Sequence, residues 1–268
     1  MTMPIDLVLV RHGESEGNVA NRMSRAGDHS AFTPEFLSRH SSLWRLSDRG
    51  REQAGAAKKC IQEIIGSQFD RHYCSEYIRA METATLLELP KASWFLEFYL
   101  RERDWGRMDN MSQEERRRRY SDDLRLREID NFFWSPPNGE SMAQVCLRID
   151  RVLHTLHREC SDMRVIMICH ADLMWGFRVR LERMPQSRYR ILDESKDPKD
   201  HIHNCHILHY TRRDPATGFL HPHLDWLRSI CPWDITLSSN LWEHIERKKY
   251  ANEELAQEVA KHHRMING

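Results

Sequence analysis

No two cysteines in this sequence have the CxxC spacing of a redox or zinc motif. The seven cysteines are odd in number and scattered between Cys60 and Cys231. Disulfide frameworks and structural zinc sites normally use paired cysteines at short, regular spacing. The pattern therefore argues against both kinds of site and favours a reducing compartment.

The sequence also lacks a long apolar run. The first one, residues 7–10, is too short for a signal peptide and has no basic segment before it. No stretch approaches the length needed to span a membrane. We therefore expect a cytoplasmic protein that binds no membrane.

An excess of either charge is missing as well. Lys and Arg number 40, and so do Asp and Glu. No overall field attracts nucleic acid or an anionic membrane, so any preference for anions must be local. The 268 residues predict a single domain, residues 1–268, that carries insertions.

Buried strands alternate with amphipathic helices along the chain. Residues 5–10 and 164–169 are nearly continuous apolar runs, and shorter strands are expected at 69–74 and around Ile207, Leu208 and Tyr210. Helices are predicted at 47–65, after the cap Ser47, and at 142–160, after Ser141 and Gln144 in capping-box spacing. This alternation predicts an α/β fold, a three-layer αβα sandwich around a mostly parallel sheet.

Three segments interrupt this alternation. Residues 18–46 are polar and weakly periodic, and we expect an insertion over the first loop. Residues 108–135 form a second expected insertion, with a helix opened by Ser112 and Glu115. The charged C-terminal tail, 238–268, is predicted to be helical and to pack on the domain or on a partner subunit, which makes a homodimer one expected arrangement.

Polar residues of one chemical kind follow the predicted strands. Arg11 and His12 end the first, Ser75 and Arg79 follow the second, and His170 ends the third. Ligands of open α/β sheets bind beyond the carboxyl ends of the strands. Guanidinium and imidazole groups that meet there suit a phosphoryl group.

Several motifs carry a resemblance to a known family. Residues 9–18, LVRHGESEGN, resemble the signature of the histidine phosphatase superfamily, which includes the cofactor-dependent phosphoglycerate mutases. Similar matches follow in the family's order at 46–50, 75–79, 101–106 and 138–141. The resemblance covers roughly residues 5–210 and implies the phosphoglycerate mutase-like fold.

The resemblance also implies roles for individual residues. His12 is expected to be the nucleophile that becomes phosphorylated, with Arg11, Arg79 and His170 around the phosphoryl group. Glu102 corresponds to the proton donor, although the adjacent Arg101 and Arg103 would lower its pKa if they faced it. The expected further phosphate or substrate ligands are Ser15, Asn18 and Arg103. No metal and no other cofactor is expected.

Two reactions are compatible with this site. The family's mutases usually carry a histidine after the arginine of the Glu-Arg pair, whereas Asp104 and Trp105 follow Arg103 here. We therefore expect a phosphohydrolase acting on a small phosphorylated metabolite, and phosphoglycerate mutase-type transfer is the alternative. Trp105 either stacks on a substrate ring or packs in the protein.

Three other functions compete with this interpretation. The histidine-rich segment 201–209 suggests a metal site, although one strand face does not give tetrahedral geometry. The basic run 116–119 suggests nucleic-acid binding, but the surrounding acids favour a solvated helix face and no nucleic-acid partner. An inactive scaffold with the same fold is the third alternative.

Overall fold

The first apolar segment forms the central strand of a seven-stranded sheet. In the computed structural model, which describes residues 2–266, the four apolar residues of this strand have no exposed surface. Its neighbours are the two strands predicted around 164–169 and 207–210. The strands are β1 (Asp6–Arg11), β2 (Arg71–Cys74), β3 (Trp94–Leu96), β4 (Arg164–Cys169), β5 (Ile207–Thr211), β6 (Trp226–Ile230) and β7 (Trp242–His244).

The sheet has a parallel part and an antiparallel part. The strand order is β3-β2-β4-β1-β5-β6-β7. Strands β3, β2, β4 and β1 run parallel, whereas β5, β6 and β7 each run antiparallel to the strand before them in this order. The carboxyl ends of the four parallel strands therefore share one edge of the sheet.

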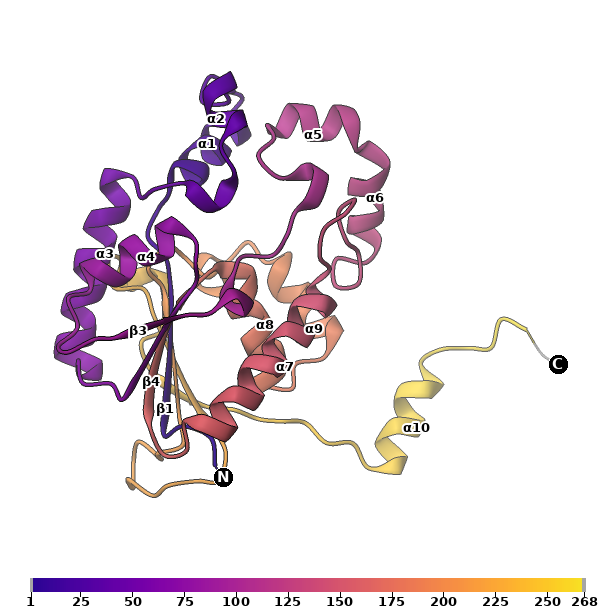
Figure 1. Ribbon diagram of the computed structural model, residues 1–268. Helices are drawn as coiled ribbons and strands as arrows, with labels where there is room; N and C mark the ends of the chain where they lie inside the picture. Colours follow the sequence, from indigo (N-terminus) through magenta and orange to yellow (C-terminus); the bar gives the residue numbers. More distant parts are fainter. Residues whose placement is uncertain (1, 267–268) are drawn as a thin grey trace.

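Helices cover both faces of the sheet (Figure 1). Alternate residues of β1 pack on opposite sides: Leu7 and Leu9 lie in the core beneath α7 (Met142–Glu159) and α8 (Ala171–Leu181), and Val8 and Val10 lie in the core beneath α3 (Asp48–Cys60) and α4 (Ile78–Leu86). The helices are α1 (Glu16–Arg25), α2 (Pro34–Ser38), α3 (Asp48–Cys60), α4 (Ile78–Leu86), α5 (Gln113–Arg119), α6 (Ser121–Ile129), α7 (Met142–Glu159), α8 (Ala171–Leu181), α9 (Gln186–Asp193) and α10 (Asn252–Ala260).

The predicted three-layer α/β fold is confirmed. The caps of α3 and α7 lie where the sequence placed them: Ser47 accepts a hydrogen bond from Gly50, and Ser141 forms a capping box with Gln144. The predicted helix over 47–65 is α3 followed by a π-helical turn at Ile61–Ile65. Strands β3, β6 and β7 were not predicted. Strands β3 and β7 have three residues each and are largely exposed, whereas β6 has five residues that are buried or half-buried, with the polar Arg228 and Ser229 among them.

The two predicted insertions lie above the carboxyl ends of the parallel strands (Figure 1). The first contains most of α1 as well as α2, so it is more helical than its weak periodicity suggested. The second contains α5, which begins after Ser112 as predicted, and α6. The insertions touch, since the backbone N–H of Gln113 donates to Ser24 Oγ at 2.8 Å.

The tail differs from the predicted helical segment. Residues Trp242–His244 pair with β6 as the edge strand β7, where the Trp242 ring lies 4.9 Å from the His209 ring. Within residues 238–266 only Asn252–Ala260 is helical, and residues 251–266 are exposed. The helical prediction rested on a thin apolar stripe. At residues 242–244 the pairing with β6 and the Trp242–His209 contact favour a strand instead. No helix within residues 2–266 has both the length and the apolar composition to cross a membrane.

A close approach of two backbones fixes the loop after β1. A side chain on Gly13 would collide with the carbonyl of Gly50, and one on Gly50 would collide with the carbonyl of Glu14. The loop is also tied by two side chains: Gly13 N donates to Thr83 Oγ1 at 3.1 Å, and Glu14 N donates to Gln53 Oε1 at 2.9 Å. The start of α3 therefore sets the position of His12.

Two glycines of α3 provide a test of this contact. We expect Gly50→Ala to lower the free energy of unfolding by about 1–3 kcal/mol, because the new methyl group meets backbone that cannot move aside. Gly55→Ala, in the same helix with nothing within 4 Å of the added carbon, should raise stability by about 0.5–1 kcal/mol. Urea denaturation measures both, and a stabilised Gly50→Ala variant would show that the approach is not tight.

Candidate active site

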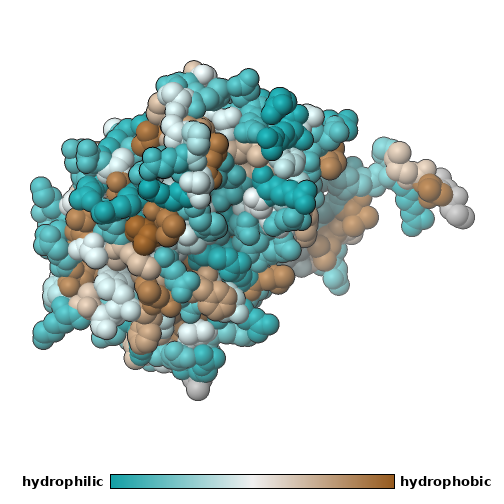
Figure 2. Space-filling view, turned by 45° about the horizontal axis from the view of Figure 1, so that its top comes forward, coloured by the Kyte–Doolittle hydropathy of each residue, from teal (hydrophilic) through white to brown (hydrophobic). Residues whose placement is uncertain are grey.

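Three strand ends bring the predicted site residues to one cavity. Arg11 ends β1 and His12 follows it, Arg79 lies in the first turns of α4 after β2, and His170 follows β4 as the N-cap of α8. Arg11, His12, Arg79 and Glu102 line a cavity of about 540 Å³, and the His12 and His170 ring centroids are 5.1 Å apart. Figure 2 shows a mainly hydrophilic surface on the side of the molecule that includes the two insertions.

The hydrogen bonds of His12 define its tautomer. Its side chain is 1% exposed, and its Nδ1 lies 2.7 Å from the carbonyl oxygen of Gly13, which can only accept. Nδ1 therefore carries the proton. Arg79 Nε donates to His12 Nε2 at 3.1 Å, so Nε2 presents its lone pair. Burial, and then the charges of Arg79 and Arg11, hold the pKa of His12 well below its usual range, which keeps the ring neutral at pH 7.

Two guanidinium groups flank His12 without a carboxylate partner. Arg79 Nη1 donates to the carbonyl of Ser41 at 2.8 Å, and Arg11 Nη1 donates to the carbonyl of Ile202 at 2.7 Å. Among residues 2–266 neither arginine is within ion-pair distance of an acidic side chain, and Arg11 Nε is buried with no hydrogen-bond partner. Buried positive charge of this kind is costly unless an anion compensates it.

His170 adds an unused donor or acceptor beside His12. Its Nε2 lies 2.8 Å from Ser75 Oγ, and its fully buried Nδ1 has no hydrogen-bond partner among the described residues. Burial and the charge of Arg79 lower the pKa of His170 as well. Because His170 caps α8, the positive end of that helix also faces the cavity, where Ala171 lies at the wall.

Glu102 is the acidic group closest to the two histidines. One ring nitrogen of each histidine and one Glu102 oxygen lie within 4.8 Å of one another, and Glu102 Oε2 is 3.8 Å from His170 Nδ1. The neighbouring Arg101 turns away to pair with Glu140, and Arg103 Nε donates to the carbonyl of Glu140 at 2.7 Å. Burial, and then the charge of Asp172, raise the pKa of Glu102 to about 7. The side chain can therefore donate or accept a proton near neutral pH.

The remaining predicted ligands border the cavity but are engaged with the protein. Ser15 caps α1, and Asn18 Oδ1 accepts hydrogen bonds from Ser15 N at 3.1 Å and from Asn204 Nδ2 at 3.1 Å. Arg103 is 5% exposed, and its Nη2 donates to the carbonyl of Trp134 at 3.2 Å. In this structure Ser15 and Arg103 donate to protein atoms, whereas Asn18 is engaged through its acceptor Oδ1 and its Nδ2 donates to no protein atom of the described residues.

The sequence missed a second group of arginines in the same cavity. Arg25, Arg116 and Arg127 come from α1, α5 and α6 and line its outer part. The expectation of a solvated basic run is right for Arg117–Arg119 but wrong for Arg116, which lies one turn after Ser112 on the inward side of α5. Only the spacing from that cap could have indicated this.

The Trp105 ring contacts two of the outer arginines. The guanidinium carbons of Arg116 and Arg127 lie 5.5 and 5.4 Å from the centre of the Trp105 ring. The Arg103 guanidinium also lies over Trp105, at 5.2 Å. Trp105 therefore packs against charged groups of the protein by cation–π contact, and it also lines the cavity.

The histidine-rich segment has other partners than a metal. His203 bonds the carbonyl of Pro198, His206 bonds Ser229 Oγ, and His209 contacts Asp6 at 3.2 Å. Among residues 2–266 the histidines, cysteines and acids that come close enough to share a metal ion are His12, Glu102 and His170. The adjacent charges of Arg11 and Arg79 oppose a cation there.

Comparison with known proteins agrees with this geometry. A model of the histidine phosphatase superfamily (branch 1) matches residues 7–207. The chain belongs to this superfamily. It is 30% identical over 171 residues to human 6-phosphofructo-2-kinase/fructose-2,6-bisphosphatase 3, a match that covers 64% of this chain and 28% of that protein. The chain thus spans less than a third of the length of the curated relatives it matches.

Solved phosphatases of this superfamily share the fold. A putative alpha-ribazole-5'-P phosphatase from Escherichia coli superimposes with a TM-score of 0.61 at 18% identity, over 82% of this chain and 96% of that one. A mycobacterial glucosyl-3-phosphoglycerate phosphatase in complex with VO3 gives a TM-score of 0.60 at 22% identity, over 76% and 92%. At these identities the similarity establishes the fold.

The pKa of Glu102 can be tested through Asp172. Asp172→Asn removes a negative charge that disfavours the Glu102 carboxylate, so we expect the pKa of Glu102 to fall below its value of about 7. NMR titration of the ¹³C-labelled glutamate carboxyl groups measures this shift. Asp104→Asn, at the same cavity, is the matched control and should leave the pKa in place. An unchanged pKa in Asp172→Asn would contradict the assigned cause.

Proposed function

We propose that this protein is a phosphohydrolase that removes a phosphoryl group from a small phosphorylated metabolite through a phosphohistidine on His12. The observation that carries the proposal is the neutral His12 ring, whose Nε2 accepts from Arg79, in the field of Arg79 and Arg11, two guanidiniums that lack a carboxylate partner. An imidazole in this form is a competent nucleophile, and a phosphoryl group supplies the missing negative charge.

The reaction divides into two steps. In the first, His12 Nε2 forms a bond to phosphorus while the bond to the ester oxygen breaks, and Glu102 gives its proton to that oxygen. In the second, Glu102 takes a proton from water, the water oxygen bonds to phosphorus, and the bond to Nε2 breaks, which releases inorganic phosphate. A carboxyl group with a pKa of about 7 suits both transfers.

The arginines and His170 stabilise charge on the transferred group. Arg79 already donates to the nucleophilic nitrogen, and Arg11 Nε and His170 Nδ1 have no protein partner within the described residues. A phosphoryl oxygen would satisfy these atoms. Preorganised donors of this kind contribute about 3–4 kcal/mol each where single deletions have been measured in other enzymes.

Hydrolysis is favoured over mutase-type transfer. Asp104 follows Arg103 where the mutases usually carry a histidine, and its Oδ1 accepts a hydrogen bond from Gly106 N at 2.7 Å. The indole of Trp105, the next residue, offers no acid or base. The phosphatase activities named for the relatives and structural neighbours agree with this choice. All seven cysteines are free and buried, which supports the cytoplasm as the site of action.

The outer arginines favour a substrate with a second anionic group. Burial and the charges of Arg25 and Arg127 lower the pKa of Arg116, against an opposing effect of Asp109, so these guanidiniums repel one another in the free protein. Arg118 and Arg119 pair with Glu115, but Arg25, Arg116 and Arg127 have no acidic partner within residues 2–266. A phosphate or carboxylate on the distal part of the substrate would relieve this repulsion.

The reaction itself is tested with p-nitrophenyl phosphate in the presence of EDTA. We expect metal-independent hydrolysis that falls by at least about a thousandfold in His12→Ala, because the nucleophile is lost. His203→Ala, a histidine outside the cavity, is the matched control and should retain activity. Full activity in His12→Ala would contradict the mechanism, and an inactive wild type on every phosphomonoester would favour the scaffold alternative.

The second anionic group is tested with a panel of phosphomonoesters that do or do not carry one. For substrates that do, Arg116→Gln and Arg127→Gln should each raise KM about tenfold, with little change for p-nitrophenyl phosphate. Arg119→Gln, in the same helix but exposed, is the control. Equal effects on both substrate classes would contradict the assignment, and an isomerised product in place of inorganic phosphate would establish the mutase alternative.

A further inference from the structure

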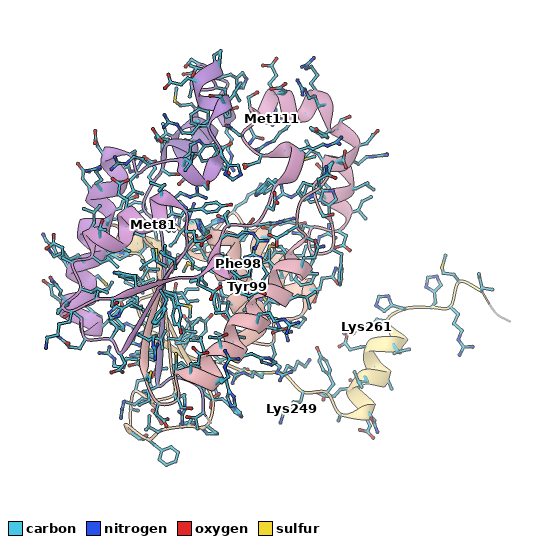
Figure 3. All side chains as sticks on the ribbon, viewed as in Figure 1. Met81, Phe98, Tyr99, Met111, Lys249 and Lys261 are labelled. Carbon is cyan, nitrogen blue, oxygen red and sulfur yellow. The ribbon has the colours of Figure 1, made fainter. Side chains whose placement is uncertain are left out.

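Helix α10 has no partner in its own chain. It stands apart from the domain at the end of an extended segment, beyond Lys249 and before Lys261 (Figures 1 and 3). Its two large apolar side chains, Leu255 and Val259, are 49% and 70% exposed. They are four residues apart and so lie on one face of the helix. An isolated helix of nine residues is marginal in water, so this one is expected to need a packing partner.

The same helix is acidic. Glu253, Glu254 and Glu258 lie within Asn252–Ala260, which contains no basic residue. Glu254 and Glu258 form a row directly beside Leu255 and Val259, whereas Glu253 points to the opposite side. Lys261, after the helix, pairs with Glu258 at 2.7 Å. The apolar face is therefore bordered by negative charge along one side.

A groove with an apolar floor and a basic border, complementary to α10, lies at the opposite end of the sheet from the active site. Its volume is about 680 Å³, and it is formed near the start of β1, the end of α7 and the end of α8. Met3, Leu153, Leu181 and Leu224 supply its apolar lining. Its other lining residues are all basic or histidine, namely Arg180, Arg183, His223, Arg247, Lys248 and Lys249.

Part of the positive charge in the groove is unpaired. Arg180 pairs with Asp150 at 2.7 Å, and Arg247 pairs with Asp225 at 2.5 Å. Arg183 and Lys249 have no acidic partner within residues 2–266. The groove thus offers an apolar floor with free positive charge at its border, which matches the apolar stripe and glutamate row of α10.

The chain's own α10 is poorly placed to enter this groove. Lys249 lines the groove, and only Tyr250 and Ala251 separate it from the helix. Ala251 is extended, with φ −69° and ψ 164°, so the chain continues outward where a return would need a turn. A second copy of the chain does not have this constraint.

We call the segment from Tyr250 to the end of α10 the C-terminal arm. We propose that two copies of this protein exchange these arms, so that each α10 docks in the basic groove of the other copy. The groove and the arm are adjacent along the chain, so a single twofold axis near Tyr250 places each arm in the groove of the other copy. This exchange satisfies both grooves and both arms, so the assembly stops at two subunits. Leu255 and Val259 pack on the apolar floor, and Glu254 and Glu258 face Arg183 and Lys249.

Analytical ultracentrifugation of the full chain tests this dimer. We expect a species of twice the 32.0 kDa chain mass at micromolar concentration. Leu255→Gln combined with Val259→Gln should raise the dimer dissociation constant at least about tenfold, with an unchanged circular dichroism spectrum. Ala260→Gln, on the far side of the helix, is the control and should leave the dimer intact.

A charge exchange identifies the groove. Glu254→Lys with Glu258→Lys should dissociate the dimer, and adding Arg183→Glu with Lys249→Glu should restore it, whereas Glu253→Lys should have no effect. A wild type that is monomeric at every concentration overturns the proposal. If that monomer protects the α10 amides from hydrogen exchange, the helix folds back on its own chain. A dimer that is indifferent to all these variants uses another surface, which also overturns it.

Discussion

Arg11 and Arg79 bring two positive charges to a buried position beside His12, and no acidic side chain of the described residues pairs with either. This uncompensated charge determines the properties of its neighbours. Together with burial, which is the larger cause, it holds the pKa of His12 and His170 down, so both rings are neutral, and it favours an anion in the cavity. Burial and the charge of Asp172 raise the pKa of Glu102 to about 7, so near neutrality part of the Glu102 carboxyl is protonated. The groups proposed as nucleophile, anion site and proton donor thus depend on one another electrostatically.

The fold supplies this arrangement through the parallel half of the sheet. The strands β1, β2 and β4 end at one edge of the sheet. The rings of His12 and His170 are therefore in contact, although more than a hundred and fifty positions separate them in the sequence. The contact between Gly13 and Gly50 then fixes the loop in which His12 lies. The insertions contribute the outer arginines to the same cavity. In the proposed function, chemistry and substrate choice are therefore carried by different parts of the chain, as is common where loops vary on a constant scaffold.

The residues around His12 could be predicted from the sequence, whereas the outer arginines could not, for a physical reason. Strand patterns stop at Arg11, His12 and His170, and parallel strand ends meet, so local signals were enough to bring these residues together. The Arg116 side chain faces the cavity because of how α5 packs against α1. That long-range contact produces no periodic pattern in the sequence. The same holds for β7, where three residues join the sheet through a Trp242–His209 contact. The effect of Arg101 and Arg103 on Glu102 likewise depended on where their side chains point, which Glu140 decides.

In the proposed mechanism His12 Nε2 carries the phosphoryl group between the two steps. Rapid quenching of the enzyme during turnover of a phosphomonoester, followed by ³¹P NMR and peptide mapping, tests this directly. We expect an acid-labile phosphoramidate on Nε2 of His12, the nitrogen that lacks a proton, and none on His170. Steady hydrolysis with no phosphorylated histidine, or with the phosphoryl group on another residue, would contradict it.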